Sequence, residues 1–262
     1  LCSVAGSAIA WVRAASPFRP SVTRPPVRRL SPAGEARSGR RPARPQEVRL
    51  KVNVVNAQDS LEGLPPELVT VLMVDFQNEF CHPAACRPGG PANAHNAETA
   101  LRANAFARRA AAAGARVLYT RQEFDPEQLT PRQRHWDEAL KLCPKGSWQA
   151  ELFIEPVPGA EVVVKHRFDV WQSEQFQAYL ERTPVEGFVI AGVELSCCVL
   201  FAVLGTDERG YRLTVPQDLV SGLDEGDTTY NRAVRELLRH KYHAPASAVS
   251  VLQNWEALPR RS

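Results

Sequence analysis

Five short apolar runs constrain the fold of this chain more than any other feature of its sequence. Each run spans five to eight residues, is rich in valine, isoleucine or leucine, and is largely continuous rather than apolar at every second position. Runs of this kind are typical of β-strands that are covered on both faces. The sequence therefore predicts strands over residues 69–76, 116–120, 161–165, 187–193 and 211–216, with 248–253 as a candidate sixth.

Stretches with helical character lie between these runs. They cover residues 97–114, 173–182, 197–210 and 229–240. Ser173 is placed to cap the start of one helix, and Gly114 and Gly210 are placed to end two others. Strands that alternate with helices form βαβ units. We therefore predict a three-layer, doubly wound α/β fold with a mostly parallel sheet.

The first fifty residues differ in composition from the rest of the chain. They carry ten arginines and two acidic residues, a balance of +8, and because the whole chain carries +3 the other 212 residues carry −5. A segment rich in proline, arginine and serine, without apolar periodicity, does not bury enough surface to offset the entropy of ordering it. We predict a disordered basic tail over residues 1–50 and a single domain over 51–262.

Two origins of this tail stay open. Its arginine-rich, serine-rich and acid-poor composition is that of an organelle transit peptide. The chain begins with Leu1 and its only methionine is Met73, which fits a translated upstream region or a truncated precursor equally well. No aromatic interleaving or nucleic-acid-binding fold accompanies the arginines, so we predict no nucleic-acid partner.

The remaining composition excludes two further classes of protein. No apolar run approaches the roughly 18 residues of a membrane span, so we predict no membrane partner. Six cysteines, two of them adjacent, do not form a disulfide framework, and a reducing compartment (cytoplasm or organellar matrix) is expected. The segment CHPAAC, residues 81–86, offers two cysteines and a histidine but no fourth ligand. We expect an ordinary loop there, and neither a metal nor a cofactor.

Three reactive side chains follow predicted strands. In open parallel sheets, ligands bind at the carboxyl ends of the strands, where Asp75, Lys165 and Cys198 stand. A cysteine attacks as its thiolate, which a nearby lysine and a helix N-terminus favour. An aspartate is able to take the thiol proton and return it to a leaving amine. Each residue alone usually has a structural role, but together they form an Asp–Lys–Cys catalytic triad.

Four motifs, in this order, resemble those of the isochorismatase-like hydrolases, most of which are cysteine amidohydrolases. The resemblance covers roughly residues 66–222. VLMVDFQNEF resembles the family's opening strand with its Asp-x-Gln-Asn-x-Phe signature, and CPKGSWQAEL is similar to a Gly-[Ser/Thr]-x-x-Ala-Glu-Leu segment. VVVKHRFDVW carries a Lys-x-Arg-Phe motif, and GVELSCCV resembles Gly-Val-x-x-x-x-Cys-Val, in which four residues separate the two pairs.

The resemblance implies a role for each residue at the end of the fourth strand. Counting six residues from Gly192 reaches Cys198, the implied nucleophile, whereas Cys197 falls where the family has an apolar residue. The family carries a cis peptide that corresponds to Val193–Glu194, and an oxyanion hole made by the backbone N–H groups of Glu194 and Cys198. A homo-oligomer, dimer or tetramer, is also implied.

The departures from the family pattern narrow the range of possible substrates. Family members that hydrolyse nicotinamide bind a metal through an Asp-x-His whose positions are occupied here by Gln122 and Phe124, and neither is a suitable ligand. We therefore expect a metal-independent cysteine hydrolase that cleaves an amide, carbamoyl or ureido C–N bond of a small molecule through an acyl-thioester. The alternatives are an isochorismatase that cleaves a vinyl ether and a catalytically silent scaffold protein.

Four residues beside the motifs are candidates for binding this substrate: Gln77, Phe80, Phe168 and Trp171. The orientation of Glu194 stays open at this stage. Its carboxylate binds a cationic substrate if it points into the pocket, and is a solvated charge if it points outward.

Overall fold

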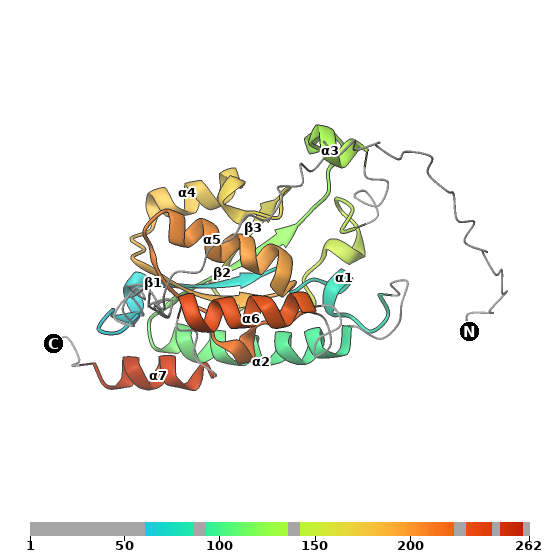
Figure 1. Cartoon of the computed structure of the whole chain (residues 1–262). Coiled ribbons are helices and arrows are strands. Elements are labelled where there is room, and N and C mark those ends of the chain that lie inside the picture. The colour runs from blue at the N-terminus through green and yellow to red at the C-terminus, as the bar shows by residue number, and fades with distance from the viewer. Residues whose placement is uncertain (1–60, 86–92, 136–141, 223–228, 243–246, 259–262) are drawn as a thin grey trace, which may run out of the picture. The chain divides into compact units, whose positions relative to one another are not determined.

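A five-stranded sheet forms the centre of the computed structural model, and all neighbouring strands are parallel (Figure 1). The structure describes residues 61–85, 93–135, 142–222, 229–242 and 247–258. The strands are β1 (Val69–Val74), β2 (Arg116–Gln122), β3 (Glu161–Lys165), β4 (Gly187–Gly192) and β5 (Arg212–Thr214). All five strands predicted from continuous apolar runs are confirmed. Strands β1 and β4 are buried along their whole length, whereas the edge strand β3 exposes Glu161 and Val162.

The strand order, β3-β2-β1-β4-β5, determines where a ligand binds. The chain proceeds outward from β1 through β2 to β3, then returns to the other side of β1 to form β4 and β5. The connections therefore diverge between β1 and β4, and in open parallel sheets the crevice at this switch point receives the ligand. Val74 of β1 pairs with Gly192 of β4 at this point.

Helices cover both faces of the sheet, which confirms the predicted three-layer α/β fold (Figure 1). Residues such as Val71 and Met73 point toward one layer, and Leu72 and Val74 point toward the other. The first layer contains α2 (Asn93–Ala112) and α7 (Val249–Glu256), and the second contains α4 (Glu174–Arg182), α5 (Leu200–Glu208) and α6 (Thr229–Lys241).

Several short helices occupy the connections. They are α1 (Asn78–Cys81), α3 (Pro131–Arg134), a π-helix (Leu195–Val199) and the 3₁₀ helices Pro66–Leu68, Pro126–Gln128, Trp148–Ala150, Val170–Gln172 and Gln217–Leu219. The predicted helix over 197–210 is therefore divided into the π-helix and α5. A single π turn inside a helical segment often marks a functional site.

Three local signals in the sequence are confirmed. The hydroxyl of Ser173 accepts a hydrogen bond from the N–H of Phe176, so it caps α4 as predicted. Gly114 and Gly210 follow α2 and α5 with φ angles of 104° and 75°, a left-handed conformation that glycine adopts without steric cost.

The predicted sixth strand is wrong, because residues 249–256 form helix α7. The buried side chains of this segment are Ala248, Val251, Leu252 and Trp255, a spacing of three, four and seven that suits one face of a helix. A short valine-containing run fits a strand or a helix segment. Here the packing of Trp255 into the core between the sheet and the first helical layer distinguishes the two.

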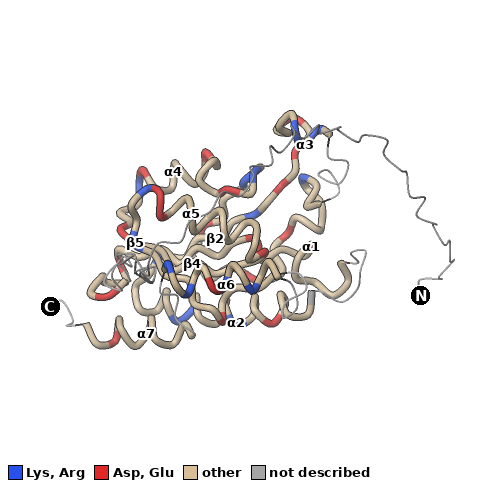
Figure 2. The backbone as a smooth tube through the Cα atoms, in the orientation of Figure 1, with Lys and Arg blue, Asp and Glu red and all other residues tan. Residues whose placement is uncertain are grey.

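The tail over residues 1–50 and the domain boundary at 51 lie outside the described residues, so those expectations stay predictions. Among the described residues, no helix is long and apolar enough to cross a membrane. Figure 2 shows lysines and arginines intermixed with aspartates and glutamates on the helices around the sheet.

We expect a large loss of stability when Gly192 is replaced by alanine. A Cβ at this position would lie 2.5 Å from both the Cβ and the carbonyl oxygen of Val74, and the φ angle is +154°. Overpacking of this kind costs about 1–3 kcal/mol or more, because paired strands are not free to separate. Gly159 has a φ angle of +81° with nothing within 4 Å, so Gly159→Ala serves as a control with backbone strain alone. Equal losses of unfolding free energy in Gly192→Ala and Gly159→Ala, measured by urea unfolding, would contradict the expectation.

Candidate active site

The ammonium of Lys165, at the end of β3, is the centre of the candidate active site. Its Nζ lies 2.7 Å from Oδ2 of Asp75, and both side chains are completely buried. The same nitrogen donates to Oε1 of Gln122 at 2.8 Å, to the carbonyl of Arg167 at 3.1 Å and to Sγ of Cys198 at 3.5 Å. The structure therefore brings together all three residues that were predicted to form the triad.

The distribution of hydrogen bonds around Lys165 leaves one carboxylate oxygen available. An ammonium has three donors, and these serve Gln122, Arg167 and Cys198. Oδ2 of Asp75 meets the ammonium through charge, but accepts no hydrogen bond of normal geometry from the described residues.

Asp75 is held in an unusual conformation directly after β1. Its φ angle is 52°, in a left-handed region where aspartate is several-fold enriched among residues other than glycine. Thr120 at the end of β2 donates to Oδ1 at 2.5 Å and accepts from the Asp75 N–H at 3.1 Å. The threonine hydroxyl therefore positions both the backbone and the side chain of Asp75. Such local strain is concentrated at functional sites.

The segment that carries Cys198 follows β4 and is held by a neighbouring loop. The peptide bond between Val193 and Glu194 is cis, as the resemblance implied. The N–H of Leu195 donates to the carbonyl of Ser221, and the N–H of Ser221 donates to the carbonyl of Gly192. Cys198 then lies within the π-helix, 4% exposed and one hydrogen bond from Lys165.

The carboxylate of Glu194 is hydrogen-bonded within the protein. Oε1 accepts from Nδ2 of Asn96 in α2 at 3.0 Å, and the side chain is partly exposed. Asn96 is fully buried, donates also to the carbonyl of Phe80, and accepts from the hydroxyl of Ser221 at 2.5 Å. Glu194 is thus anchored toward α2, while part of its side chain stays exposed.

The charge of Lys165 is stabilised by its surroundings. Burial by itself lowers the pKa of the ammonium, but the Asp75 carboxylate and Cys198 outweigh burial and raise the pKa to about 12. Lys165 therefore remains protonated at physiological pH.

The thiol of Cys198 has the opposite tendency to the one expected from sequence. The hydrogen bond with Cys197 and burial raise its pKa well above the ordinary thiol value, against the effect of Lys165. The same hydrogen bond lowers the pKa of Cys197, against the effect of burial. Lys165 thus favours the thiolate as expected, but the hydrogen bond with Cys197 and burial outweigh it in the resting site. Cys198 keeps its proton until a base removes it.

We expect Cys197→Ala to lower the apparent pKa of Cys198, because the contact that raises it most is removed. The rate of alkylation of Cys198 by iodoacetamide, followed by mass spectrometry across pH, should show its midpoint at a lower pH than in the wild-type protein. Loss of packing at Cys197 should cost only about 1 kcal/mol, and most turnover should remain. An unchanged or higher midpoint would contradict the role of Cys197.

The four candidate substrate-binding residues have different surroundings. The amide of Gln77 is fully occupied by backbone groups of Gln122 and Ala150. Phe80 is buried in the core beside α2. Trp171 is 4% exposed in the core of the other layer, and its indole N–H donates to Thr206 of α5. The structure therefore gives Gln77, Phe80 and Trp171 packing or positioning contacts.

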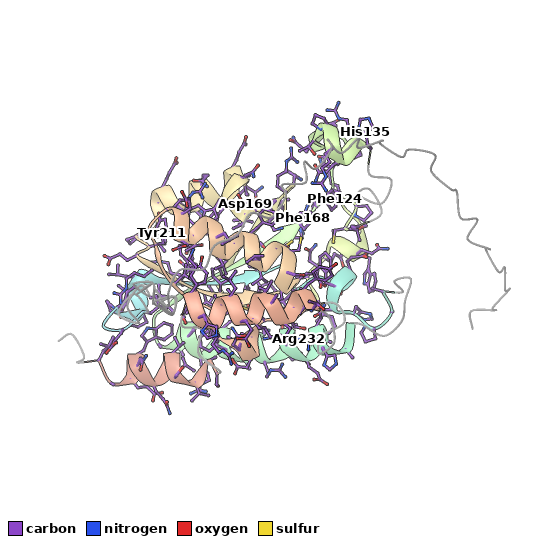
Figure 3. The ribbon with its side chains drawn as sticks, viewed as in Figure 1. Phe124, His135, Phe168, Asp169, Tyr211 and Arg232 are labelled. Carbon is purple, nitrogen blue, oxygen red and sulfur yellow. The ribbon has the colours of Figure 1, made fainter. Side chains whose placement is uncertain are left out.

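Phe168 is the one of the four that remains partly exposed near the triad. Its ring meets Phe124 edge-on, with centroids 6.4 Å apart, and Phe201 at 6.3 Å (Figure 3). Phe124 also belongs to a small apolar cluster with Leu129. The carbonyl of Arg167, next to Phe168 in the chain, accepts from the Lys165 ammonium, and Phe168 packs against the apolar cluster that contains Cys198.

The residues at the position of the family's metal site do not fit a divalent metal. The amide oxygen of Gln122 is turned toward the Lys165 ammonium, and Phe124 has no donor atom. Within the described ranges, no group of three or more histidine, cysteine or acidic side chains is placed to hold a metal ion. The chemistry derived below has no step through a metal.

Two residues with direct contacts in the site had no functional role in the sequence analysis. Thr120 was part of a predicted strand, and Asn96 preceded a predicted helix. The only available signal was position, because Thr120 lies at the carboxyl end of β2, next to Asp75. The side-chain contacts of Asn96 with Glu194 and Ser221 join residues about 100 positions apart, which no local pattern reveals.

The chain is similar to known proteins in sequence and in fold. Residues 69–240 match the family model described as the Isochorismatase domain. Ureidoacrylate amidohydrolase RutB from Azorhizobium caulinodans is 28% identical over 152 residues, an alignment that covers 51% of this chain and 67% of that protein.

Solved structures share the fold. A cysteine hydrolase from Pseudomonas syringae pv. phaseolicola superposes with a TM-score of 0.63 and 17% identity, covering 75% of this chain and 97% of that one. N-carbamoylsarcosine amidase from Thermoplasma acidophilum gives a TM-score of 0.54 and 20% identity, and the match covers 68% of this chain and 95% of that one. An isochorismatase family protein from Desulfovibrio vulgaris gives a TM-score of 0.57 and 23% identity, and the match covers 73% of this chain and 100% of that one.

Proposed function

Because this chain belongs to the isochorismatase family and is a hydrolase, we propose that it cleaves a small amide, carbamoyl or ureido C–N bond with Cys198 as nucleophile. One observation carries the proposal: the buried Lys165 ammonium contacts both the Asp75 carboxylate and the Cys198 sulfur. A nucleophile, a base and a fixed positive charge thus come from three different strands to one point, which has no evident packing purpose.

Asp75 is the base in this mechanism. The hydrogen bond with Cys197 and burial raise the pKa of the Cys198 thiol, and Oδ2 of Asp75, beside the Lys165 ammonium, accepts no hydrogen bond of normal geometry from the described residues. Asp75 removes the thiol proton as the sulfur attacks the substrate carbonyl carbon, and Lys165 stabilises the new thiolate charge. The C–N bond then breaks, the nitrogen takes the proton from Asp75, and an acyl-thioester remains on Cys198.

Hydrolysis of the thioester repeats these steps with water as nucleophile. Asp75 takes a proton from water, the hydroxyl oxygen bonds to the acyl carbon, and the C–S bond breaks. The sulfur regains its proton, which returns the site to its starting state. In both halves we assign the developing oxyanion to the backbone N–H groups of Glu194 and Cys198, and donors so placed are each worth about 3–4 kcal/mol.

The substrate is small because the reactive groups are buried at the end of the sheet. The partly exposed Phe168, with Phe124 and Phe201, is the aromatic wall that we assign to this pocket. The name of the relative RutB, an amidohydrolase that acts on a ureido compound, supports a C–N bond over the vinyl ether of an isochorismatase.

Mass spectrometry of the intact protein tests the proposal. After exposure to a library of primary amides and ureido compounds, with rapid acid quenching, Cys198 should carry an acyl group that hydroxylamine removes. Cys198→Ala should carry none. Turnover of isochorismate alone, without any adduct, would establish the vinyl-ether alternative. No adduct, together with a Cys198 alkylation rate no faster than that of free cysteine, would establish the scaffold alternative.

We also propose that the protein is a homo-oligomer. Helix α5 is apolar on most of its surface, a pattern typical of helices that are covered on all sides. Yet Phe201 and Leu204 are 47% and 42% exposed in the single chain. Sedimentation of the wild-type protein beside a Leu204→Glu variant tests whether a second copy covers this face.

A further inference from the structure

Gln122 carries a buried hydrogen-bond donor that the protein does not use. The residue ends β2 and is 1% exposed. No acceptor for its Nε2 group exists among the described residues. A buried polar group left without a partner costs about 1–3 kcal/mol, so an unpaired donor in a native structure calls for a partner such as a ligand, an ion or a water molecule.

The orientation of this amide is determined by Lys165. An ammonium only donates, and its Nζ lies 2.8 Å from the Gln122 side chain, so the atom facing it is the oxygen. Rotating the amide by half a turn would place its N–H₂ against the ammonium, donor against donor. Nε2 is therefore kept on the side of the carboxamide that faces away from Lys165.

The neighbouring Gln77 shows what a purely structural glutamine looks like in this site. Its Nε2 donates to the carbonyls of Gln122 and Ala150 at 2.9 and 2.8 Å, and its Oε1 accepts from the Gln122 N–H at 2.8 Å. Every polar atom of that side chain has a partner. Among the described residues Gln122 has a partner for its oxygen only, although both amides are buried near the carboxyl ends of the neighbouring strands β1 and β2.

The unused donor is close to the reacting atoms but distinct from the oxyanion donors. Gln122 Oε1 and Cys198 Sγ accept hydrogen bonds from the same ammonium. The oxyanion donors that we assigned, Glu194 and Cys198, follow β4, whereas Gln122 ends β2 on the other side of β1. Nε2 is thus placed for a part of the substrate other than the scissile carbonyl.

The charge of the site indicates what kind of acceptor fits. The Lys165 ammonium is balanced by the Asp75 carboxylate, and formation of the Cys198 thiolate adds a further negative charge. A substrate carboxylate beside these groups would be repelled in a buried environment, where charge interactions are strong. An uncharged carbonyl oxygen meets a neutral amide donor without this penalty.

We propose that Gln122 is a specificity-determining residue whose Nε2 donates to a second, uncharged carbonyl oxygen of the substrate. This inference rests on the proposed function, and it deepens it by naming the substrate class. The class is small diamides, acylureas and related compounds in which the cleaved C–N bond lies within a few atoms of another neutral carbonyl. Amides of plain hydrocarbon chains lack the acceptor and leave Nε2 unpaired.

The test compares two amides of similar shape: malonamide, which has a second carbonyl, and isovaleramide, which has a branched hydrocarbon instead. For each amide, two quantities are measured: the concentration that halves the rate at which iodoacetamide alkylates Cys198, and the rate of ammonia release. The proteins are the wild type, Gln122→Met, Gln122→Glu and the structural control Gln77→Met. Gln122→Met removes the donor, and any effect through Lys165 is common to both probes and cancels in their ratio.

We expect the wild-type protein to prefer malonamide, and the preference to fall about tenfold in Gln122→Met. Gln122→Glu keeps an acceptor for Lys165 but places an oxygen where the donor was, so its preference should fall as well. Gln77→Met should lose thermal stability and keep the wild-type preference. A preference in Gln122→Met equal to that of the wild type, or a wild-type protein that malonamide does not protect, would overturn the inference. The expected protection pattern without ammonia release or an acyl adduct would instead count against the proposed hydrolysis.

Discussion

Cys198→Ala should abolish turnover while the protein remains folded. Alanine suits a helical segment, and the hydrogen bonds that the sulfur loses are a long one from Lys165 and the one with Cys197. Loss of a nucleophile in a triad that acts as a unit should lower kcat/KM by at least about 10⁴-fold. Ammonia release from the best amide substrate, with circular dichroism on the same samples, measures both expectations.

The adjacent cysteine provides the control for this prediction. Cys197→Ala has the same change in size, one position away, and should keep most of the activity. Activity in Cys198→Ala with none in Cys197→Ala would move the nucleophile to Cys197. Full activity in both variants would show that neither sulfur takes part in the reaction.

Lys165→Met should destabilise the protein strongly and also remove activity. The substitution leaves the Asp75 carboxylate buried without its positive partner, and breaking a buried ion pair from one side costs about 3–5 kcal/mol. The variant relieves this cost by holding a proton on Asp75 when folded. The folded variant then binds more protons than the unfolded variant at neutral pH. Its loss of stability relative to the wild-type protein should therefore shrink as the pH falls toward 4. Urea unfolding at pH 4, 6 and 8 measures this trend.

Two further variants separate the buried charge from lost packing. Asp75→Asn with Lys165→Met removes both charges, and asparagine tolerates the left-handed backbone at this position, so the double variant should be more stable than Lys165→Met alone. Lys145→Met breaks a pair in which the lysine side chain is 58% exposed and the Asp125 side chain 8% exposed, and should lower stability much less. Equal losses in Lys165→Met and Lys145→Met would show that the Lys165 charge is not buried.

The parallel sheet was predictable because its signal is local. A strand covered on both faces needs a continuous apolar run, and each of the five runs is visible in the sequence. The N-cap at Ser173 and the glycine at Gly114 are equally local, since each depends on one side chain and the next turn. The segment 248–253 is the exception. A short apolar run suits a strand or a helix, and the segment is helical because its buried side chains pack on one face into the core of the first helical layer.

The positions of Asp75, Lys165 and Cys198 were also within reach of the sequence. Parallel strands bring their carboxyl ends to one edge, so residues that directly follow strands become neighbours even when they are far apart along the chain. The spacing within the motifs then distinguished Cys198 from Cys197. Strand order, by contrast, came only from the structure, and it placed β1 beside β4 at the switch point.

What only the tertiary structure decided is the state of each group in the site. The proton on Cys198, the hydrogen-bonded carboxylate of Glu194 and the unused donor of Gln122 depend on distances of about 3 Å between side chains from different strands and helices. A pattern along the chain determines which face or end a residue occupies, because backbone geometry repeats. It does not determine which partner a polar atom finds there, because that depends on how the separate elements pack together.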